Sequence, residues 1–187
     1  MYEIIIYFAL FRGLGGIKVS SKNEKPGQIP HFSRGRTERT AVARMRGGPL
    51  APAIRGTVTF RDVPAGTEVS VEVIGLPPFS RVPGQPPIGP HGFHIHEFGN
   101  CRVGNPEDPF LAAGEHWNPD NQPHGNHAGD FPVLFSNRGL ARMTFFTSRF
   151  KVADIIERSV IIHESPDDYR TQPAGASGRR LACGVII

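Results

Sequence analysis

Seven side chains that can bind metal ions lie in three short blocks of this chain, and bringing them together is the strongest constraint on its fold. The blocks read GFHIHEFG, HWNPDNQPHGNHAGD and SVIIH. Imidazole is a good ligand for copper and zinc, and a single carboxylate among imidazoles is typical of zinc. We therefore expect distant segments to meet at one two-metal site, formed by His94, His96, His116, His124, His127, Asp130 and His163.

Residues 47–187 have the sequence pattern of an all-β protein. Valines alternate with polar residues over 68–73, which is the period of a strand with one buried face. The 22 glycines and 18 prolines favour turns and loops between strands. Further strands are expected at 57–60, 93–97, 139–146, 159–163 and 181–187. Two long loops, 99–132 and 164–180, border the candidate ligands, and loops of that length in a compact domain are usually functional.

The net charge of +4 is unevenly distributed. Residues 1–46 hold nine Lys/Arg and three Glu, whereas residues 47–187 hold twelve Lys/Arg and fourteen Asp/Glu. We therefore predict a flexible basic extension over 1–46 and a folded domain over 47–187, with no nucleic-acid partner for the domain. The apolar run Ile4–Phe11 is too short to span a bilayer and lacks the flanks of a convincing signal peptide, so no stable membrane insertion is expected.

The first histidine pair fits the geometry of a strand. In Phe93–His96, the two imidazoles point to one face while Phe93 and Ile95 point to the other, where they can enter the core. His163 adds a third imidazole from another strand, and three histidines suit a redox-active copper. A lone His-x-His pair is also compatible with an ordinary polar strand face.

The middle block carries the more specific signal. His116, His124, His127 and Asp130 occur within fifteen residues, among glycines and prolines that let a loop fold back on an ion. Three nitrogens and one carboxylate oxygen form a closed tetrahedral site, the arrangement of a structural zinc. The competing interpretation is a polar surface loop with incidental histidines, which so dense a cluster does not favour.

The segments GFHIHEFG, GEHWNP, HAGD, IIHE followed by DD, and LACGVI, in this order, resemble the copper/zinc superoxide dismutase family of bacterial type. The resemblance runs from about Arg46 to the C-terminus. It implies an eight-stranded antiparallel Greek-key β-barrel, an immunoglobulin-like sandwich with two long functional loops. It also implies an oxidoreductase that converts superoxide to oxygen and hydrogen peroxide. The alternative is a non-catalytic copper- and zinc-binding protein of similar fold.

The resemblance also implies a role for each site residue. Copper is expected at His94, His96, His116 and His163, and zinc at His116, His124, His127 and Asp130, so that His116 bridges the two ions and takes part in catalysis. Arg180 matches the arginine that attracts the anionic substrate, although Arg179 is adjacent. Asp167 matches a carboxylate that links a copper-ligand histidine to a zinc-ligand histidine. Cys101 and Cys183 match a disulfide.

The sequence departs from the family pattern at a few positions. The gap between His124 and His127 is short, and Tyr169-Arg170 replace the usual Leu-Gly, which puts the shape of the substrate channel in doubt. A disulfide favours an extracytoplasmic location, in conflict with the weak export signal. Bacterial relatives vary in oligomeric state, so a homodimer is one option.

Overall fold

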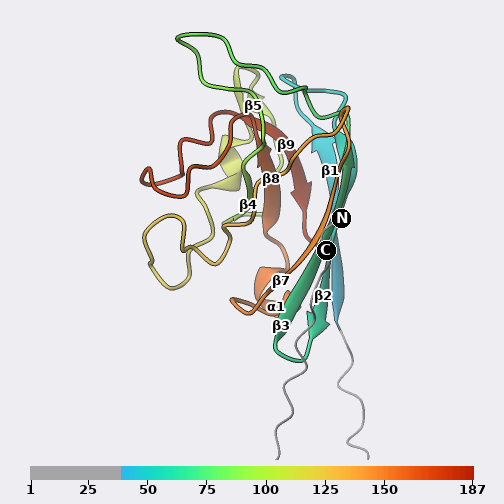
Figure 1. Ribbon diagram of the computed structural model, residues 1–187. Helices are drawn as coiled ribbons and strands as arrows, with labels where there is room; N and C mark the ends of the chain where they lie inside the picture. Colours follow the sequence, from blue (N-terminus) through green and yellow to red (C-terminus); the bar gives the residue numbers. More distant parts are fainter. Residues whose placement is uncertain (1–38) are drawn as a thin grey trace, which may run out of the picture. The chain divides into compact units, whose positions relative to one another are not determined.

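The computed structural model describes residues 39–187, which form a curled antiparallel sheet of seven strands in the order β4-β8-β9-β1-β2-β3-β7 (Figure 1). Short elements accompany the sheet, and no helix in the described part of the chain is long and apolar enough to cross a membrane. The elements are β1 (Thr40–Gly47), β2 (Arg55–Val63), β3 (Gly66–Ile74), β4 (Phe93–His96), β5 (Gly104–Asn105), β6 (Asp108–Pro109), η1 (Leu111–Ala113), β7 (Ala141–Thr147), α1 (Val152–Ile155), β8 (Ser159–His163) and β9 (Arg180–Val185).

The connections cross between the two edges of the sheet. Strands β3 and β7 pair at one edge, and β4 and β8 pair at the other. The connections β3–β4, β4–β7 and β7–β8 therefore each run from one edge of the sheet to the other. These crossings give a Greek-key order. In Figure 1, β4, β8 and β9 face the layer of β1, β2, β3 and β7, and two long loops extend beyond β4 and β8.

The resemblance implies an eighth strand, and the segment Asp130–Leu134, whose first residues were expected to belong to a loop, takes its place. It runs antiparallel to the chain around β4 through isolated bridges, His94 to Asp130 and His91 to Leu134. Its Phe131 ring lies 5.2 Å from the ring of Phe93 and 5.0 Å from that of Phe145 on β7, so it packs against both edges of the sheet. Pro132 has no amide hydrogen to add to a continuous ladder. The predicted all-β antiparallel barrel is confirmed, with this irregular segment closing it.

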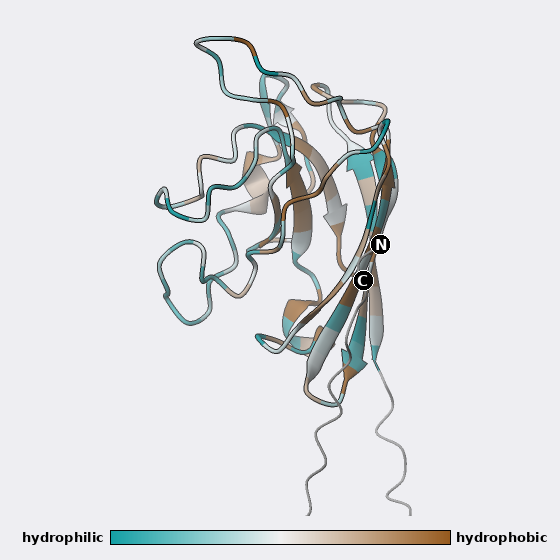
Figure 2. Cartoon of the chain, in the orientation of Figure 1, coloured by the Kyte–Doolittle hydropathy of each residue, from teal (hydrophilic) through white to brown (hydrophobic). Residues whose placement is uncertain are grey.

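The core is formed by the inward faces of the strands. The three valines of β3 are buried, as their alternation with polar residues predicts. Phe93 and Ile95 of β4 belong to the same core, which leaves the two histidines of β4 on the opposite face. Strand β8 is buried along its whole length and is strongly hydrophobic, whereas much of the long loops is hydrophilic (Figure 2).

Strand β1 places the start of the folded domain earlier than the predicted boundary at residue 46. Thr40–Gly47 pairs with β2 along its length and reaches β9 at its end. Ala41, Ala43 and Met45 are buried in the core, while Arg44 and Arg46 are exposed. Small alanines and positive charges hid the period of this strand in the sequence. The remainder of the predicted flexible extension lies outside the described residues.

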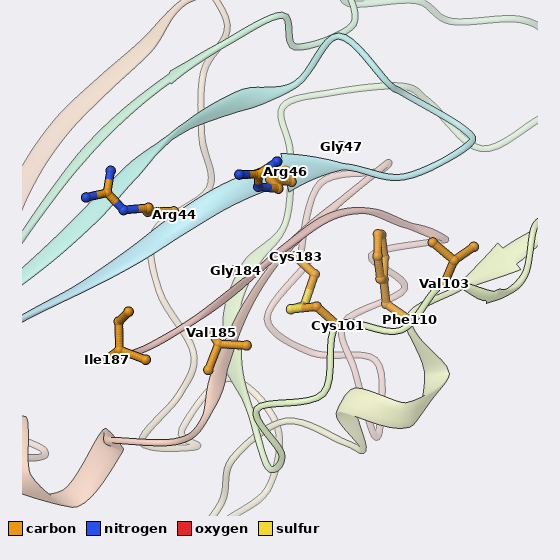
Figure 3. A pocket seen from close by; sticks show the side chains of 10 residues that line it. All are labelled: Arg44, Arg46, Gly47, Cys101, Val103, Phe110, Cys183, Gly184, Val185 and Ile187. Atoms are coloured by element: carbon orange, nitrogen blue, oxygen red, sulfur yellow. A yellow bond between two sulfur atoms is a disulfide. The ribbon is translucent and has the colours of Figure 1, made fainter.

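The predicted disulfide between Cys101 and Cys183 ties the β4–β7 connection to β9 across a sequence separation of 82 residues. A closed loop of that length stabilises a fold by about 4–5 kcal/mol on the chain-entropy argument. The disulfide lies beside a surface pocket of about 450 Å³, which Arg44 and Arg46 of β1 also line (Figure 3). The bond fixes the part of the connection that leads to the candidate site.

Deleting residues 1–46 is expected to abolish cooperative folding, because the deletion removes β1 from between β2 and β9 and opens the core. A truncation that begins at Thr37 retains β1 and is the matched control. Circular dichroism with thermal unfolding measures the difference. A fragment of residues 47–187 that unfolds with the same midpoint as the control would show that β1 is dispensable.

Candidate metal centre

All seven predicted metal-binding side chains come together on the outer side of β4 and β8. His94 and His96 lie on β4, and His163 ends β8. Isolated bridges join His96 to His116 and His94 to Asp130, which brings the middle block to β4. The potential ligand atoms form two groups, each with all its atoms within 4.8 Å of one another: His94, His96, His116 and His163, and His116, His124, His127 and Asp130.

His116 belongs to both groups. Its Nδ1 lies 3.1 Å from Oδ1 of Asp130, whereas its Nε2 is buried and has no hydrogen-bond partner. The His116 ring stacks on that of His94, with ring centroids 3.9 Å apart. One imidazole therefore presents one nitrogen to each group.

Four buried nitrogens in this cluster have no hydrogen-bond partner among the described residues. They are Nδ1 of His94, Nε2 of His116, Nδ1 of His124 and Nδ1 of His127. A buried polar atom without a partner costs about 1–3 kcal/mol, so such atoms are rare unless something satisfies them. Four of them at one place fit the lone pairs that metal ions accept, and the residues present therefore suit copper and zinc.

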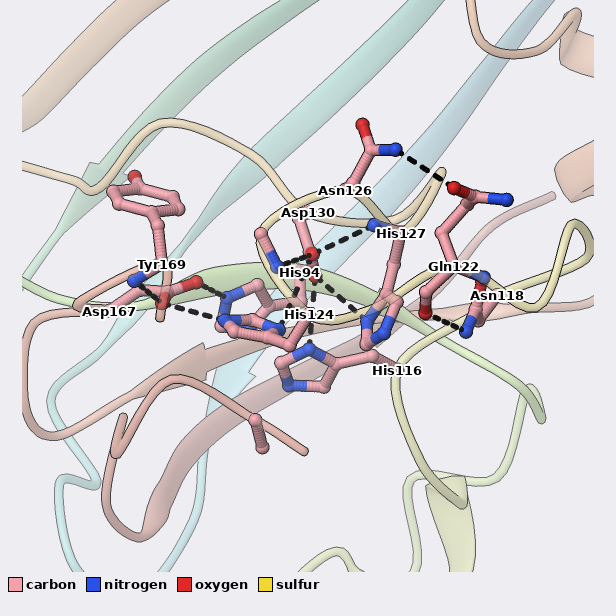
Figure 4. A network of polar contacts seen from close by, with 12 residues as sticks. His94, His116, Asn118, Gln122, His124, Asn126, His127, Asp130, Asp167 and Tyr169 are labelled. Atoms are coloured by element: carbon pink, nitrogen blue, oxygen red, sulfur yellow. Dashed lines mark hydrogen bonds and ion pairs between the residues drawn. The ribbon is translucent and has the colours of Figure 1, made fainter. Parts of the chain in front are cut away.

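Asp167 orients one histidine of each group. Its Oδ2 accepts a hydrogen bond of 2.7 Å from Nε2 of His94, and its Oδ1 accepts one of 2.8 Å from Nε2 of His124 (Figure 4). Because a carboxylate only accepts, each of these Nε2 atoms carries the hydrogen and each Nδ1 keeps its lone pair. The predicted link between the two groups is formed by side chains that are fully buried.

Backbone carbonyls orient His96 and His163, the two members of the first group that neither Asp167 nor Asp130 contacts. Nδ1 of His96 donates to the carbonyl of Gly114 at 2.9 Å, and Nδ1 of His163 donates to the carbonyl of Gly178 at 3.2 Å. The two Nε2 atoms consequently face each other at 3.3 Å. Sequence reasoning missed both carbonyls, because any residue type can supply one.

Glycine is required where the loop 164–180 passes the Asp167 bridge. Gly175 has a positive φ of 67°, a conformation that favours glycine. A Cβ at this position would collide with Oδ1 of Asp167 and Nε2 of His124. The backbone can therefore approach the buried carboxylate closely and cover it from solvent.

Arg180, rather than Arg179, lies beside the first group. Its two terminal nitrogens donate to the carbonyls of Phe110 and Gly114, both at 2.7 Å. Gly114 also accepts the hydrogen bond from His96, so one carbonyl holds the guanidinium and an imidazole together. Burial lowers the pKa of Arg180, but a guanidinium in a protein stays protonated. Arg179 instead forms an exposed ion pair with Glu164, with N–O distances of 2.6 and 2.9 Å.

Burial and crowding keep His94, His96 and His163 neutral. Burial lowers the pKa of His163 to about 3, and His116 adds to the effect. Burial and neighbouring imidazoles likewise hold the pKa values of His94 and His96 well below the ordinary value. Burial alone would raise the pKa of Asp130, but the hydrogen bond from His116 and the nearby imidazoles lower it. These three imidazoles are therefore neutral and Asp130 is ionised at neutral pH, which are the forms that bind metals.

The described residues form a Greek-key barrel with two groups of potential ligands that share one histidine. This fold and site are those of an all-β protein that binds two metal ions. Residues 54–186 match the family described as copper/zinc superoxide dismutase (SODC). The chain belongs to this family.

Relatives and solved structures agree with this assignment. The Deinococcus radiodurans superoxide dismutase [Cu-Zn] is 40% identical over 150 residues, covering 71% of this chain and 77% of that protein. The Legionella pneumophila protein of the same name is 37% identical over 147 residues, covering 74% and 81%. The structure of Cu/Zn superoxide dismutase from Brucella abortus has a TM-score of 0.65 and 32% identity, and covers 80% of this chain and all of that one.

The metal-free protein is expected to lose stability as the pH falls below about 6.5, the ordinary pKa of histidine. Burial lowers the folded-state pKa values of His94, His96 and His163, to about 3 for His163. Between the folded-state pKa and the ordinary value of about 6.5, the unfolded chain therefore binds more protons than the folded one. The unfolding free energy therefore falls with pH, by at most about 1.4 kcal/mol per pH unit for each histidine. Urea denaturation of metal-free protein between about pH 7.5 and pH 5 measures the slope.

A His163→Gln variant is the control for this pH dependence, because it removes one titrating ring and should reduce the slope. Stability that stays constant down to about pH 5 in the metal-free wild type would contradict burial of neutral imidazoles.

Proposed function

We propose that this chain dismutates superoxide to oxygen and hydrogen peroxide with one copper and one zinc ion per chain. Family membership supports the reaction and both cofactors. The observation that carries the proposal is the shared imidazole of His116, whose two nitrogens face two different groups of ligands. No observation favours the non-catalytic alternative, since the residues that catalysis needs are present.

The orphaned nitrogens support a specific division of ligands. We assign copper to Nδ1 of His94 and to Nε2 of the other three members of the first group, His96, His116 and His163. We assign zinc to Nδ1 of His116, His124 and His127, together with Oδ1 of Asp130. Bound copper would supply one-electron redox chemistry, and bound zinc is redox-silent and structural. Protein groups hold the second ring nitrogen of His94, His96, His124 and His163 and the second oxygen of Asp130. These side chains therefore need little rearrangement to bind.

His116 is the residue best placed to handle a proton. Formation of one hydrogen peroxide from two superoxide ions consumes two protons. Nε2 of His116 is buried without a hydrogen-bond partner among the protein groups, so it can carry one of these protons when it is not bound to copper. Its Nδ1 is held on the Asp130 side, which keeps the ring oriented while Nε2 gains or loses a proton.

Arg180 supplies a fixed positive charge beside the first group. Its two short hydrogen bonds to backbone carbonyls hold the guanidinium in one orientation, next to His96. The group is about half buried, where a charge acts on a small anion more strongly than in bulk water. Arg180 can therefore attract superoxide and orient it, and the two carbonyls that hold it are part of this function.

The loaded protein is expected to contain one copper and one zinc per chain. His163→Ala should lose copper and keep zinc, because His163 belongs to the first group only. His127→Ala should show the opposite loss, because it belongs to the second group only. Elemental analysis after metal loading and dialysis measures both ions. Zinc alone in the copper-loaded wild type would contradict the two-metal assignment.

Arg180→Ile is expected to retain both metals but to lower the second-order rate of superoxide removal by about tenfold or more, since electrostatic attraction raises association rates on that scale. The wild-type rate should also fall more steeply with ionic strength than the rate of the variant. Pulse radiolysis at several salt concentrations measures both effects.

Arg179→Ile is the matched control for Arg180→Ile, because it removes the same charge from the neighbouring position. Its rate is expected to stay close to that of the wild type, since Arg179 is engaged with Glu164 on the surface. If Arg179→Ile is the damaging change and Arg180→Ile is silent, the assignment of the arginine is wrong by one residue.

A further inference from the structure

We propose that Arg149, Tyr169 and Gln172 are positioning residues of the zinc-ligand segment, defined here as residues 124–133. Each side chain comes from outside the segment and holds its backbone at a different point. Together they keep the segment in its ligating shape before zinc binds. The inference rests on the proposed zinc site and concerns how this chain builds it.

Gln172 holds the beginning of the zinc-ligand segment. Its Oε1 accepts a hydrogen bond of 2.8 Å from the amide of His124, and its Nε2 donates to the carbonyl of the same residue at 3.3 Å. The side-chain amide thus pairs with both backbone groups of a proposed ligand. This pairing fixes the position from which the His124 ring enters the site.

Arg149 holds the middle of the segment. It follows β7, and its guanidinium donates to the carbonyl of His127 at 2.6 Å and to Oδ1 of Asn126 at 2.9 Å. Asn126 in turn donates to Gln122 at 3.2 Å (Figure 4). The turn that carries His127 is therefore attached to the barrel and does not depend on the loop alone.

Tyr169 holds the end of the segment. Its hydroxyl donates to the carbonyl of Phe131 at 3.0 Å and accepts from the amide of Val133 at 2.9 Å. The tyrosine amide donates to Oδ1 of Asp167 at 2.7 Å, which links this contact to the carboxylate that orients His124. Tyr169 therefore fixes the chain just after Asp130.

Backbone hydrogen bonds join Gly129 and Phe131 to β4, so the part of the segment that needs external contacts is the turn 124–128, whose internal hydrogen bonds are concentrated on Asp130. Oδ2 of Asp130 accepts from the amides of Gly125 and His127, at 2.9 and 3.0 Å. These bonds shape the turn but do not attach it to the barrel. The amides of His124 and Val133, at the two ends, are the ones that Gln172 and Tyr169 satisfy. A short segment that carries two imidazoles and one carboxylate of the second group is thus held at its start, middle and end.

Zinc affinity measures this role directly. We would compare Arg149→Gln, Tyr169→Phe, Gln172→Ala and the triple variant by competing a chelator for zinc against the full-length metal-free chain. Each single change should weaken zinc binding about twofold to tenfold, the usual value of one or two partly exposed hydrogen bonds. The triple variant should weaken it about 10- to 100-fold, as loss of the groups around metal ligands does.

Two changes of the same chemical type serve as controls. Arg142→Gln removes an exposed arginine of β7 that forms an ion pair with Glu72 of β3. Gln85→Ala removes an exposed glutamine from the β3–β4 connection. Both controls should bind zinc as the wild type does. Equal weakening in the controls would overturn the proposal.

Amide hydrogen exchange of the metal-free protein separates positioning from general stability. Tyr169→Phe should remove protection from the amide of Val133, and Gln172→Ala should remove it from that of His124, while the strands stay protected. His127→Ala tests the zinc site itself. If His127→Ala binds zinc like the wild type, the zinc assignment fails and the inference fails with it. If His127→Ala loses zinc but the variants of Arg149, Tyr169 and Gln172 bind zinc normally and show unchanged hydrogen exchange, only the inference fails.

Discussion

Burial of neutral imidazoles around a single shared histidine is the constraint on which the rest of this structure depends. A ring removed from water must stay uncharged and must have its nitrogens satisfied, or the fold loses stability. Here Asp167 satisfies one nitrogen each of His94 and His124, and two backbone carbonyls do the same for His96 and His163. These contacts fix which nitrogen carries the hydrogen. The remaining nitrogens converge, so the protein has built a site whose stability depends on bound cations.

The Greek-key order lets each part of the site be oriented by a segment other than its own. The connection held by the disulfide supplies the carbonyls for Arg180 and His96. The loop 164–180 supplies Asp167, which orients His94 of β4 and His124 of the preceding loop. Loosening one loop therefore disturbs ligands carried by another. The long loops therefore contribute to the positions of the ligands as the strands do.

Much of the fold and site was predictable because strand period and metal chemistry leave strong sequence signals. The alternation in β3 and in Phe93–His96 gave the correct inward and outward faces, and the dense middle block indicated the second ligand group. Strand β1 was missed because alanine is a weak marker of a buried face. The carbonyl of Gly114 and the pairing of segment Asp130–Leu134 were not predictable, because backbone contacts are set by tertiary structure and not by residue type.

The two ligand groups differ in how the fold makes them rigid. Three members of the first group belong to β4 and β8, so ladder hydrogen bonds and the core already fix their backbone. In the second group, backbone bridges to β4 support His116 and Asp130, whereas side chains from elsewhere support the turn that carries His124 and His127. Tyr169, one of the two positions that depart from the family pattern, turns its hydroxyl toward segment Asp130–Leu134 and not toward Arg180. Tyr169 is therefore expected to affect how firmly the second ligand group is held. The orientation of Arg180 is set instead by the carbonyls of Phe110 and Gly114.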